Sequence, residues 1–296
     1  MKKKIFLTGA NGFIGKNILE GLSQKYNFFA PSHKQLDILD FYAVQKYYDK
    51  NGPFDTVLHT AIIGGNRKIG DSKEYAMDSL RMFFNLTSNN KFFKRFFYFG
   101  SGIEYGKESP IKNYRETDFG KRIPQSNWGL YKYACAKAVE NTDNFINFRL
   151  FGVFGKYEDW RIRFISNAIC KSIFNLPITI NQNIIMDYLY VEDLVKILDF
   201  FLKKRSKFKV YNVTSGKGID LLTLAIKINS IANKKVKIII KREGIGNEYT
   251  GNNQRLVSEF KGFEFTGINV AILQLYRWYL KKRNKIRRED LLEDYF

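Results

Sequence analysis

Short apolar runs alternate with amphipathic stretches along the first half of the chain. Runs of four to eight mostly apolar residues predict buried strands, and apolar positions three or four apart predict helices. The expected strands are residues 4–8, 27–30, 56–60, 95–99 and 145–151. The expected helices cover residues 14–22 and 41–49, a long helix that includes 79–88, and 131–140. This alternation predicts an α/β fold with a doubly wound parallel sheet.

A glycine-rich turn joins the first strand to the first helix. Its glycines allow a tight turn, close approach of the backbone to a pyrophosphate, and close packing of the helix on the strand. The free N–H groups at the helix N-terminus add an anion site. Because the turn stands between a strand and a helix, a dinucleotide site is favoured over an ordinary glycine loop. The expected cofactor contacts are Gly9, Asn11, Gly12, Phe13, Ile14 and Gly15.

The residues after the second strand bear on the choice of dinucleotide. An NAD site usually places an acidic residue about twenty residues after the turn. Here that region holds Ser32, His33 and Lys34, and no acid precedes Asp37. A hydroxyl, an imidazole and an ammonium suit a 2′-phosphate, so NADPH is expected and NAD is less favoured. The alternative is ordinary polarity of an exposed loop. Asp37 is expected near the adenine.

The alternation of strands and helices becomes irregular from about residue 165. We expect residues 1–164 to form a Rossmann-type, NADP-binding domain, with its last strand and helix returning at about 184–213. Residues 165–296 are expected to form mainly a smaller α/β substrate-binding lobe.

Charge and composition restrict the partners. The net charge is +20, from 49 Lys and Arg against 29 Asp and Glu. The basic residues are dispersed, so a solvated surface that attracts anionic small molecules is favoured over a nucleic-acid site. No apolar run is long enough for a membrane span. Two cysteines give neither a disulfide framework nor metal-ligand spacing. We expect a cytoplasmic protein with no metal, membrane or nucleic-acid partner.

A serine, a tyrosine and a lysine form a candidate catalytic group. Tyr133 and Lys137 are four residues apart on an expected helix, so they share one face. A nearby ammonium favours the phenolate, and such a tyrosine exchanges a proton with a carbonyl oxygen as hydride is transferred. Ser101 follows the fourth strand, at the carboxyl edge where ligands bind in open α/β sheets. A lone Tyr/Lys pair is more often a solvated face, but the glycine turn and Ser101 favour catalysis.

Together these motifs resemble the extended short-chain dehydrogenase/reductases, the NAD-dependent epimerase/dehydratase family, along nearly the whole chain. Within it the chain is most similar to the GDP-fucose synthases, which use NADPH to reduce a 4-keto sugar after epimerising its neighbouring carbons. The resemblance adds Ile38, Thr60 and Ala61 to the cofactor contacts, with Tyr133 and Lys137. It adds Gly64, Gly65, Ile103 and Arg163 to the substrate contacts, and implies a homodimer. The segments that carry it are residues 8–15, 30–40, 59–65, 101–106, 133–137, 149–155, 186–193, 211–216 and 276–280.

Several positions depart from the family pattern. GDP-fucose synthases carry a cysteine acid/base where this chain has Ile103, and its histidine partner aligns near Arg163. The family's 4,6-dehydratases carry Asp-Glu where this chain has Gly102 and Ile103, and Glu104 comes one place late. The usual asparagine of a substrate contact is Gly152.

These residues favour an NADPH-dependent reductase of a 4-keto nucleotide-sugar, GDP-linked and carrying a deoxy-sugar or heptose, without inversion at C3 or C5. The expected setting is polysaccharide biosynthesis. A nucleotide-sugar 4-epimerase with retained NAD has the same catalytic group and is the alternative. A non-catalytic member that binds a nucleotide for regulation or contacts RNA is a third hypothesis, sustained by the positive charge.

Overall fold

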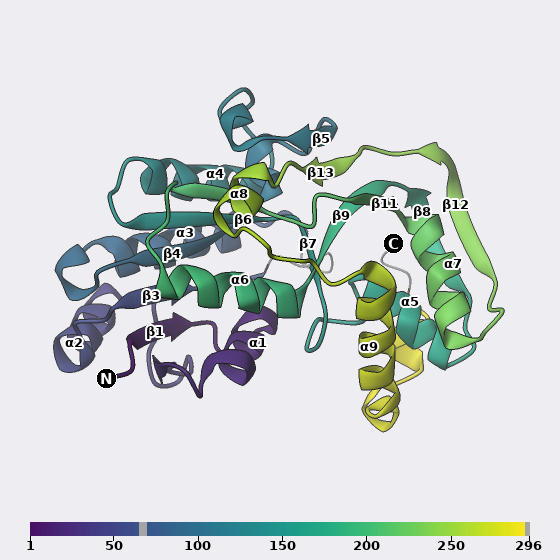
Figure 1. Cartoon of the computed structure of the whole chain (residues 1–296), viewed down its shortest axis with the longest axis horizontal. Helices are drawn as coiled ribbons and strands as arrows, with labels where there is room; N and C mark the ends of the chain where they lie inside the picture. Colours follow the sequence, from purple (N-terminus) through teal and green to yellow (C-terminus); the bar gives the residue numbers. More distant parts are fainter. Residues whose placement is uncertain (65–69, 294–296) are drawn as a thin grey trace.

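Parallel strands form the central sheet of the chain. The computed structural model describes residues 1–64 and 70–293, and within them six strands pair in the order β10-β6-β4-β3-β1-β2 (Figure 1). Each pairing in this sheet is parallel. The strands are β1 Lys4–Thr8, β2 Asn27–Phe29, β3 Thr56–His59, β4 Phe96–Ser101, β6 Phe145–Leu150 and β10 Val210–Val213.

Helices cover both faces of this sheet, because both sets of alternating side chains along its strands are apolar. Ile5 and Leu7 of β1 pack toward α1 Phe13–Leu22 and α6 Val191–Lys203. Phe6, between them, packs toward the opposite face. That face is covered by α2 Phe41–Asn51, α3 Lys73–Thr87 and α4 Asn127–Glu140. The expected doubly wound α/β fold is confirmed.

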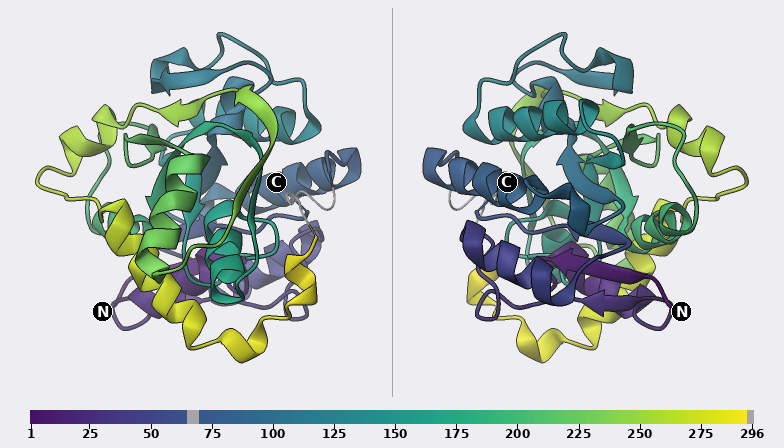
Figure 2. Two further views of the ribbon diagram at one scale, coloured as in Figure 1. Left: turned by 90° about the vertical axis from the view of Figure 1, so that its right-hand side faces the viewer. Right: turned by 90° about the vertical axis from the view of Figure 1, so that its left-hand side faces the viewer.

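A second group of elements holds its own core beside the carboxyl edge of the sheet (Figures 1 and 2). Its helices are α5 Phe164–Ile173, α7 Leu221–Ala232 and α9 Ile268–Leu280, whereas α8 Gln254–Glu259 packs beside β10 of the central sheet. Its strands pair as β11-β9-β13-β5, with β7 on β9, and as β12-β8. They are β5 Ile111–Tyr114, β7 Gly152–Phe154, β8 Ile178–Asn183, β9 Ile185–Tyr190, β11 Gly218–Asp220, β12 Ile238–Ile245 and β13 Tyr249–Gly251.

Two helices begin earlier than their apolar pattern predicts. α3 begins at Lys73 and α4 at Asn127. The hydroxyl of Ser72 accepts a hydrogen bond from the Tyr75 N–H, and the hydroxyl of Ser126 accepts one from the Gly129 N–H. Each serine satisfies an N–H group of the first turn that has no partner within the helix. The caps therefore extend both helices toward the carboxyl edge of the sheet.

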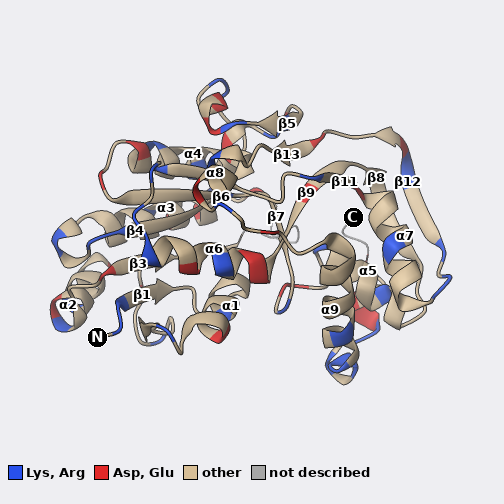
Figure 3. Cartoon of the chain, viewed as in Figure 1, with Lys and Arg blue, Asp and Glu red and all other residues tan. Residues whose placement is uncertain are grey.

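Basic side chains lie on helices, strands and loops of both parts of the molecule (Figure 3). This distribution agrees with a dispersed positive surface. Among the described residues, no helix combines the length and the apolar character that crossing a membrane requires.

Candidate active site

The glycine turn after β1 is closed by backbone contacts that only glycine permits. Gly9 has φ of +73°, and a Cβ there would lie 2.6 Å from the Ala61 nitrogen. A Cβ on Gly15 would lie 2.2 Å from the Gly9 carbonyl oxygen. The Thr60 hydroxyl donates to the Thr8 carbonyl oxygen at 2.7 Å, which holds the ends of β1 and β3 together.

The turn leaves the N-terminus of α1 open to an anion. Gly12 is the N-cap of α1 and provides no side-chain cap, so the N–H groups of the first turn have no side-chain acceptor there. Free N–H groups at a helix N-terminus bind phosphate. The residues present therefore fit the pyrophosphate of a dinucleotide.

The loop after β2 is exposed and partly paired with itself. Ser32 donates its hydroxyl hydrogen bond to Gln35 Oε1 at 3.0 Å, and His33 Nδ1 lies 3.8 Å from Asp37 Oδ1. Lys34 is exposed, whereas Ile38 is buried in the core under α2 and α3. The Ser32, His33 and Lys34 side chains follow the strand next to β1, where a bound dinucleotide would place its adenosine ribose.

Ser101 ends β4 and makes contacts from two directions. Its Oγ accepts a hydrogen bond from the Ile103 N–H at 3.3 Å and lies 3.4 Å from the Tyr249 hydroxyl of β13. Ile103 is partly exposed at the same place. The sequence therefore predicts the position of Ser101 correctly, at the carboxyl end of a strand in the parallel sheet, but gives no signal for Tyr249.

The Glu104 side chain forms a buried ion pair below the end of β4. Its carboxylate accepts from Arg149 Nε at 2.5 Å, from Asn147 Nδ2 at 3.0 Å and from the Ser101 N–H at 2.8 Å. Both side chains of the ion pair are fully buried. Burial lowers the pKa of Arg149, but the carboxylate of Glu104 and the hydroxyl of Tyr105 raise it by more. Glu104 is thus committed to holding the end of β4.

The expected pair of Tyr133 and Lys137 lies together, on the side of α4 that faces the segment after β5. A methyl group on Gly120 would lie 3.8 Å from the Tyr133 hydroxyl and 3.7 Å from Lys137 Nζ. The centroids of the Phe119 and Tyr133 rings lie 4.7 Å apart. Lys137 Nζ lies 4.6 Å from the centroid of the Phe119 ring. The structure therefore brings this pair to Phe119 and Gly120, and their catalytic role remains a prediction.

A different lysine of α4 points to the sheet. Lys132 Nζ donates a hydrogen bond to the Phe99 carbonyl oxygen of β4 at 2.7 Å and lies 4.7 Å from the Tyr98 ring centroid. Burial lowers the pKa of Lys132 to about 8, against opposing effects of Cys135 and Glu104. The Lys132 charge also adds to the burial that lowers the pKa of His59 on β3 to about 3. Lys132 thus lies over β4 and near β3, the strand between β4 and β1, which leads into the glycine turn.

The residue four positions before Lys132 is Trp128, which shares its helix face. The Trp128 indole N–H donates to the Gly70 carbonyl oxygen at 3.0 Å. Gly64 has φ of +73°, and a Cβ there would lie 2.9 Å from the Tyr75 ring and 3.1 Å from the Trp128 ring, so a side chain at this position would be strained and crowded. Its neighbour Gly65, an expected substrate contact, lies outside the described residues. Arg163, another expected contact, is exposed at the N-cap of α5.

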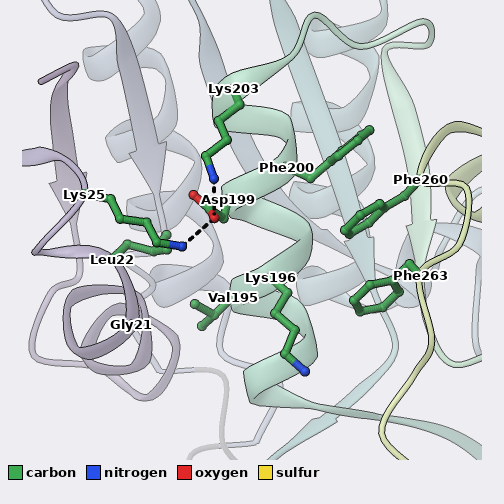
Figure 4. A pocket seen from close by; sticks show the side chains of 10 residues that line it. All are labelled: Gly21, Leu22, Lys25, Val195, Lys196, Asp199, Phe200, Lys203, Phe260 and Phe263. Atoms are coloured by element: carbon green, nitrogen blue, oxygen red, sulfur yellow. Dashed lines mark hydrogen bonds and ion pairs between the residues drawn. The ribbon is translucent and has the colours of Figure 1, made fainter.

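A pocket of about 400 Å³ lies elsewhere, between the C-terminal end of α1, α6 and the segment after α8 (Figure 4). Lys25 and Lys203 both bind Asp199 there, at 2.7 Å and 2.8 Å. Gly21 and Leu22, at the far end of α1 from the glycine turn, line this pocket. It is therefore separate from the candidate active site.

The sequence from residue 5 to residue 214 matches the model of the NAD dependent epimerase/dehydratase family. The chain belongs to this family. Membership confirms the resemblance based on the glycine turn and Ser101, the expected enzyme class, and the expectation of a nicotinamide cofactor.

One sequence relative and two solved structures are similar along nearly the whole chain. GDP-L-colitose synthase of Yersinia pseudotuberculosis is 24% identical over 307 aligned residues, which cover 95% of this chain and 99% of that protein. The structure of a GDP-mannoheptose C4 reductase from Campylobacter jejuni with NADP bound has a TM-score of 0.79 at 17% identity, covering 94% of this chain and 98% of that one. A UDP-glucose 4-epimerase of Thermus thermophilus in complex with NAD has a TM-score of 0.78 at 18% identity, covering 94% and 99%. Both structures share the fold of this chain.

Proposed function

We propose that the chain catalyses NADPH-dependent reduction of a 4-keto nucleotide-sugar, without inversion at the carbons beside the ketone. A GDP-linked deoxy-sugar or heptose is the substrate class favoured by the two relatives that act on GDP-sugars. Residues 1–164, with the return at 184–213, would bind the cofactor, and residues 165–296 would bind mainly the sugar nucleotide.

The contacts of α4 favour Lys132, rather than Lys137, as the lysine at the cofactor. Its ammonium lies beside the strand that ends at Ser101, whereas Lys137 lies against Phe119 and Glu140. In this arrangement Lys132 would donate to the nicotinamide ribose, the first turn of α1 would bind the pyrophosphate, and Ser101 would bind the keto oxygen. A bound nicotinamide cofactor supplies the hydride.

The observation that carries the proposal is an apolar side chain beside Ser101 at the position of the epimerising acid/base. Inverting a carbon next to a ketone requires one group to remove a proton and another to return it from the opposite face. Ile103 exchanges no proton. Glu104 is buried against Arg149, and position 163 carries an arginine, which does not serve as a proton acceptor, in place of a histidine. These residues favour reduction alone.

Cofactor choice rests on the loop after β2. Ser32, His33 and Lys34 offer hydrogen-bond donors and a cation to a 2′-phosphate, while Asp37 is directed to His33. These groups support NADPH over NADH.

We also expect a homodimer formed through α3 and α4. These helices expose the apolar side chains of Met77, Phe84 and Leu130, with exposed fractions of 56%, 48% and 43%. Light scattering of the purified chain would distinguish a dimer from a monomer.

The proposed activity is tested by mixing the chain with NADPH and a GDP-linked 4-keto-6-deoxyhexose. We expect oxidation of NADPH and a product with a hydroxyl at C4, with GDP-mannose as the control that lacks a ketone. A 4-epimerase would instead purify with bound NAD and interconvert C4 epimers without added NADPH. That result would replace the proposed function by the alternative.

A further inference from the structure

The proton for the keto oxygen needs a source that the cofactor-facing side of α4 does not provide. The residue four positions before Lys132 is Trp128, which carries no hydroxyl, and its indole N–H is bonded to the Gly70 carbonyl oxygen. Indole is a hydrogen-bond donor but not a working acid at neutral pH. With Lys132 at the cofactor, as proposed above, the candidate proton source is a hydroxyl group at the carboxyl end of β4, and the Tyr133 hydroxyl, which lies against Phe119, is the alternative. This inference rests on the proposed carbonyl reduction.

Tyr249 of β13 reaches Ser101 from the second part of the molecule. In the sheet, Tyr249 pairs with Ile111 of β5 and with Met186 of β9. Its ring lies 5.1 Å from the Phe151 ring, between centroids, and its hydroxyl lies 3.4 Å from Ser101 Oγ. The strand on which it lies begins after the part of the chain that matches the family model.

Two glycines make room for this contact. A Cβ on Gly102 would lie 2.6 Å from the Tyr249 hydroxyl and 2.7 Å from the Phe151 ring. A Cβ on Gly251 would lie 2.5 Å from the same ring. Real Cβ atoms do not approach that closely, so any side chain at Gly102 would displace either Phe151 or the Tyr249 hydroxyl. The absence of side chains at both positions thus permits the contact between Tyr249 and Ser101.

The hydrogen bonds of Ser101 give it a defined polarity. A serine hydroxyl accepts two hydrogen bonds and donates one. One acceptor position of Ser101 Oγ is filled by the Ile103 N–H. Burial raises the pKa of Tyr249 well above its ordinary value, which keeps its hydroxyl protonated and able to donate. With Tyr249 donating to the second acceptor position, the Ser101 hydrogen is free to point at a keto oxygen.

We propose that Tyr249 is a positioning residue that orients Ser101 and replaces the proton that Ser101 gives to the substrate. As the carbonyl carbon gains the hydride, the carbon–oxygen π pair takes the proton from Ser101 Oγ. The Ser101 oxygen takes the proton from the Tyr249 hydroxyl, and the tyrosinate regains a proton from water when product leaves. One hydride and one proton are added to the ketone, which gives the alcohol, and both hydroxyl groups end as they began.

The test compares Tyr249→Phe, Ser101→Ala and the double variant. Tyr48→Phe is the matched control, because Tyr48 is a buried tyrosine whose hydroxyl donates to the Leu86 carbonyl oxygen, far from the site. We expect Tyr249→Phe to lower kcat by about 10²-fold, the lower range for general-acid catalysis, with KM little changed. In the Ser101→Ala background the same change should have no further effect. The solvent deuterium isotope effect on kcat should be smaller in Tyr249→Phe than in the wild type.

Several results would overturn the proposal. One is a kcat of Tyr249→Phe equal to that of Tyr48→Phe. Another is a kcat of the double variant that is reduced by the product of the two single reductions. A third is loss of turnover in Tyr133→Phe while Tyr249→Phe stays active. A wild-type chain that oxidises no NADPH with any 4-keto nucleotide-sugar would instead refute the proposed function. In that case the contact between Tyr249 and Ser101 is tested by the Tm of the wild type, the two single variants and the double variant. Shifts that fail to add in the double variant would support the hydrogen bond, and additive shifts would refute it.

Discussion

The ammonium of Lys132 lies 2.7 Å from the carbonyl oxygen of Phe99, two residues before Ser101 ends β4. This contact connects the first turns of α4 to the edge of the sheet at which the glycine turn also opens. We propose that this cation binds the nicotinamide ribose, between Ser101 and α1. Lys137, five residues further along α4, lies against Phe119 and Glu140 instead.

Lys132→Met should therefore weaken NADPH binding, whereas Lys137→Met should change it little. The lost interaction is a charge-assisted hydrogen bond of about 1.5–3 kcal/mol, which corresponds to roughly a tenfold or larger rise in Kd. Fluorescence titration of both variants with NADPH measures this difference. A larger loss in Lys137→Met would favour the pair of Tyr133 and Lys137 as the catalytic group.

The same lysine predicts a pH limit. Because burial lowers the pKa of Lys132 to about 8, its charge is lost as the pH rises through that value. The kcat/KM for NADPH, which reports groups of the free enzyme, should fall above about pH 8. In the folded chain the pKa of Lys132 is about 8, below the ordinary value of 10.5. Between pH 8 and 10.5 the unfolded chain therefore binds more protons at this group, and the free energy of unfolding should increase with pH. A profile that is unchanged in Lys132→Met would assign the limit to another group.

Cofactor preference should be reversed by two changes after β2. Ser32→Asp adds a negative charge and Lys34→Ala removes a positive one, so a 2′-phosphate is repelled and a ribose hydroxyl gains an acceptor. The ratio of kcat/KM for NADPH to that for NADH measures the effect. Lys50→Ala, an exposed lysine near the end of α2, is the control and should leave the ratio unchanged. A wild-type preference for NADH would contradict the prediction and favour the epimerase with retained NAD.

Glu104→Gln should destabilise the fold strongly. It leaves the buried Arg149 guanidinium without its carboxylate, and breaking such a pair costs about 3–5 kcal/mol. Lys94→Met removes an ion pair with Asp55 in which the lysine side chain is 76% exposed, and should cost less than about 1 kcal/mol. Urea unfolding of both variants provides the comparison. Equal losses would show that the Glu104 and Arg149 pair contributes no more than a surface contact.

The sequence predicts the central sheet because its strands are continuous apolar runs between amphipathic helices. It predicts Gly9, Gly15 and Ser101 because their chemistry is local to a turn or a strand end. It does not predict Tyr249, whose place beside Ser101 depends on β13 returning from the second part of the molecule. Short strands such as β7 and β11 bring together distant segments through pairings that no local pattern encodes.

The lysine that we propose for the cofactor on α4 differs from the one that the sequence spacing selects, and the role of either lysine remains a prediction. The spacing of a tyrosine and a lysine four residues apart selects Tyr133 and Lys137 and passes over Lys132, which follows Trp128. The signal present in the sequence is periodicity, because Cys135 and Val139 lie on the same face as Lys132 and are fully buried. A lysine among buried positions at helical spacing indicates that its charge has a partner or a function.

The most direct test of reduction without inversion is the reaction run in deuterated water with NADPH and a GDP-linked 4-keto-6-deoxyhexose. The deuterium content of each carbon of the product is measured by NMR and mass spectrometry. Because Ile103 moves no proton and Glu104 is held by Arg149, we predict hydride from NADPH at C4 and no stable deuterium at C3 or C5 above a control without enzyme. Deuterium at either carbon, incorporated at the rate of turnover, would show a proton shuttle in the site and contradict the account.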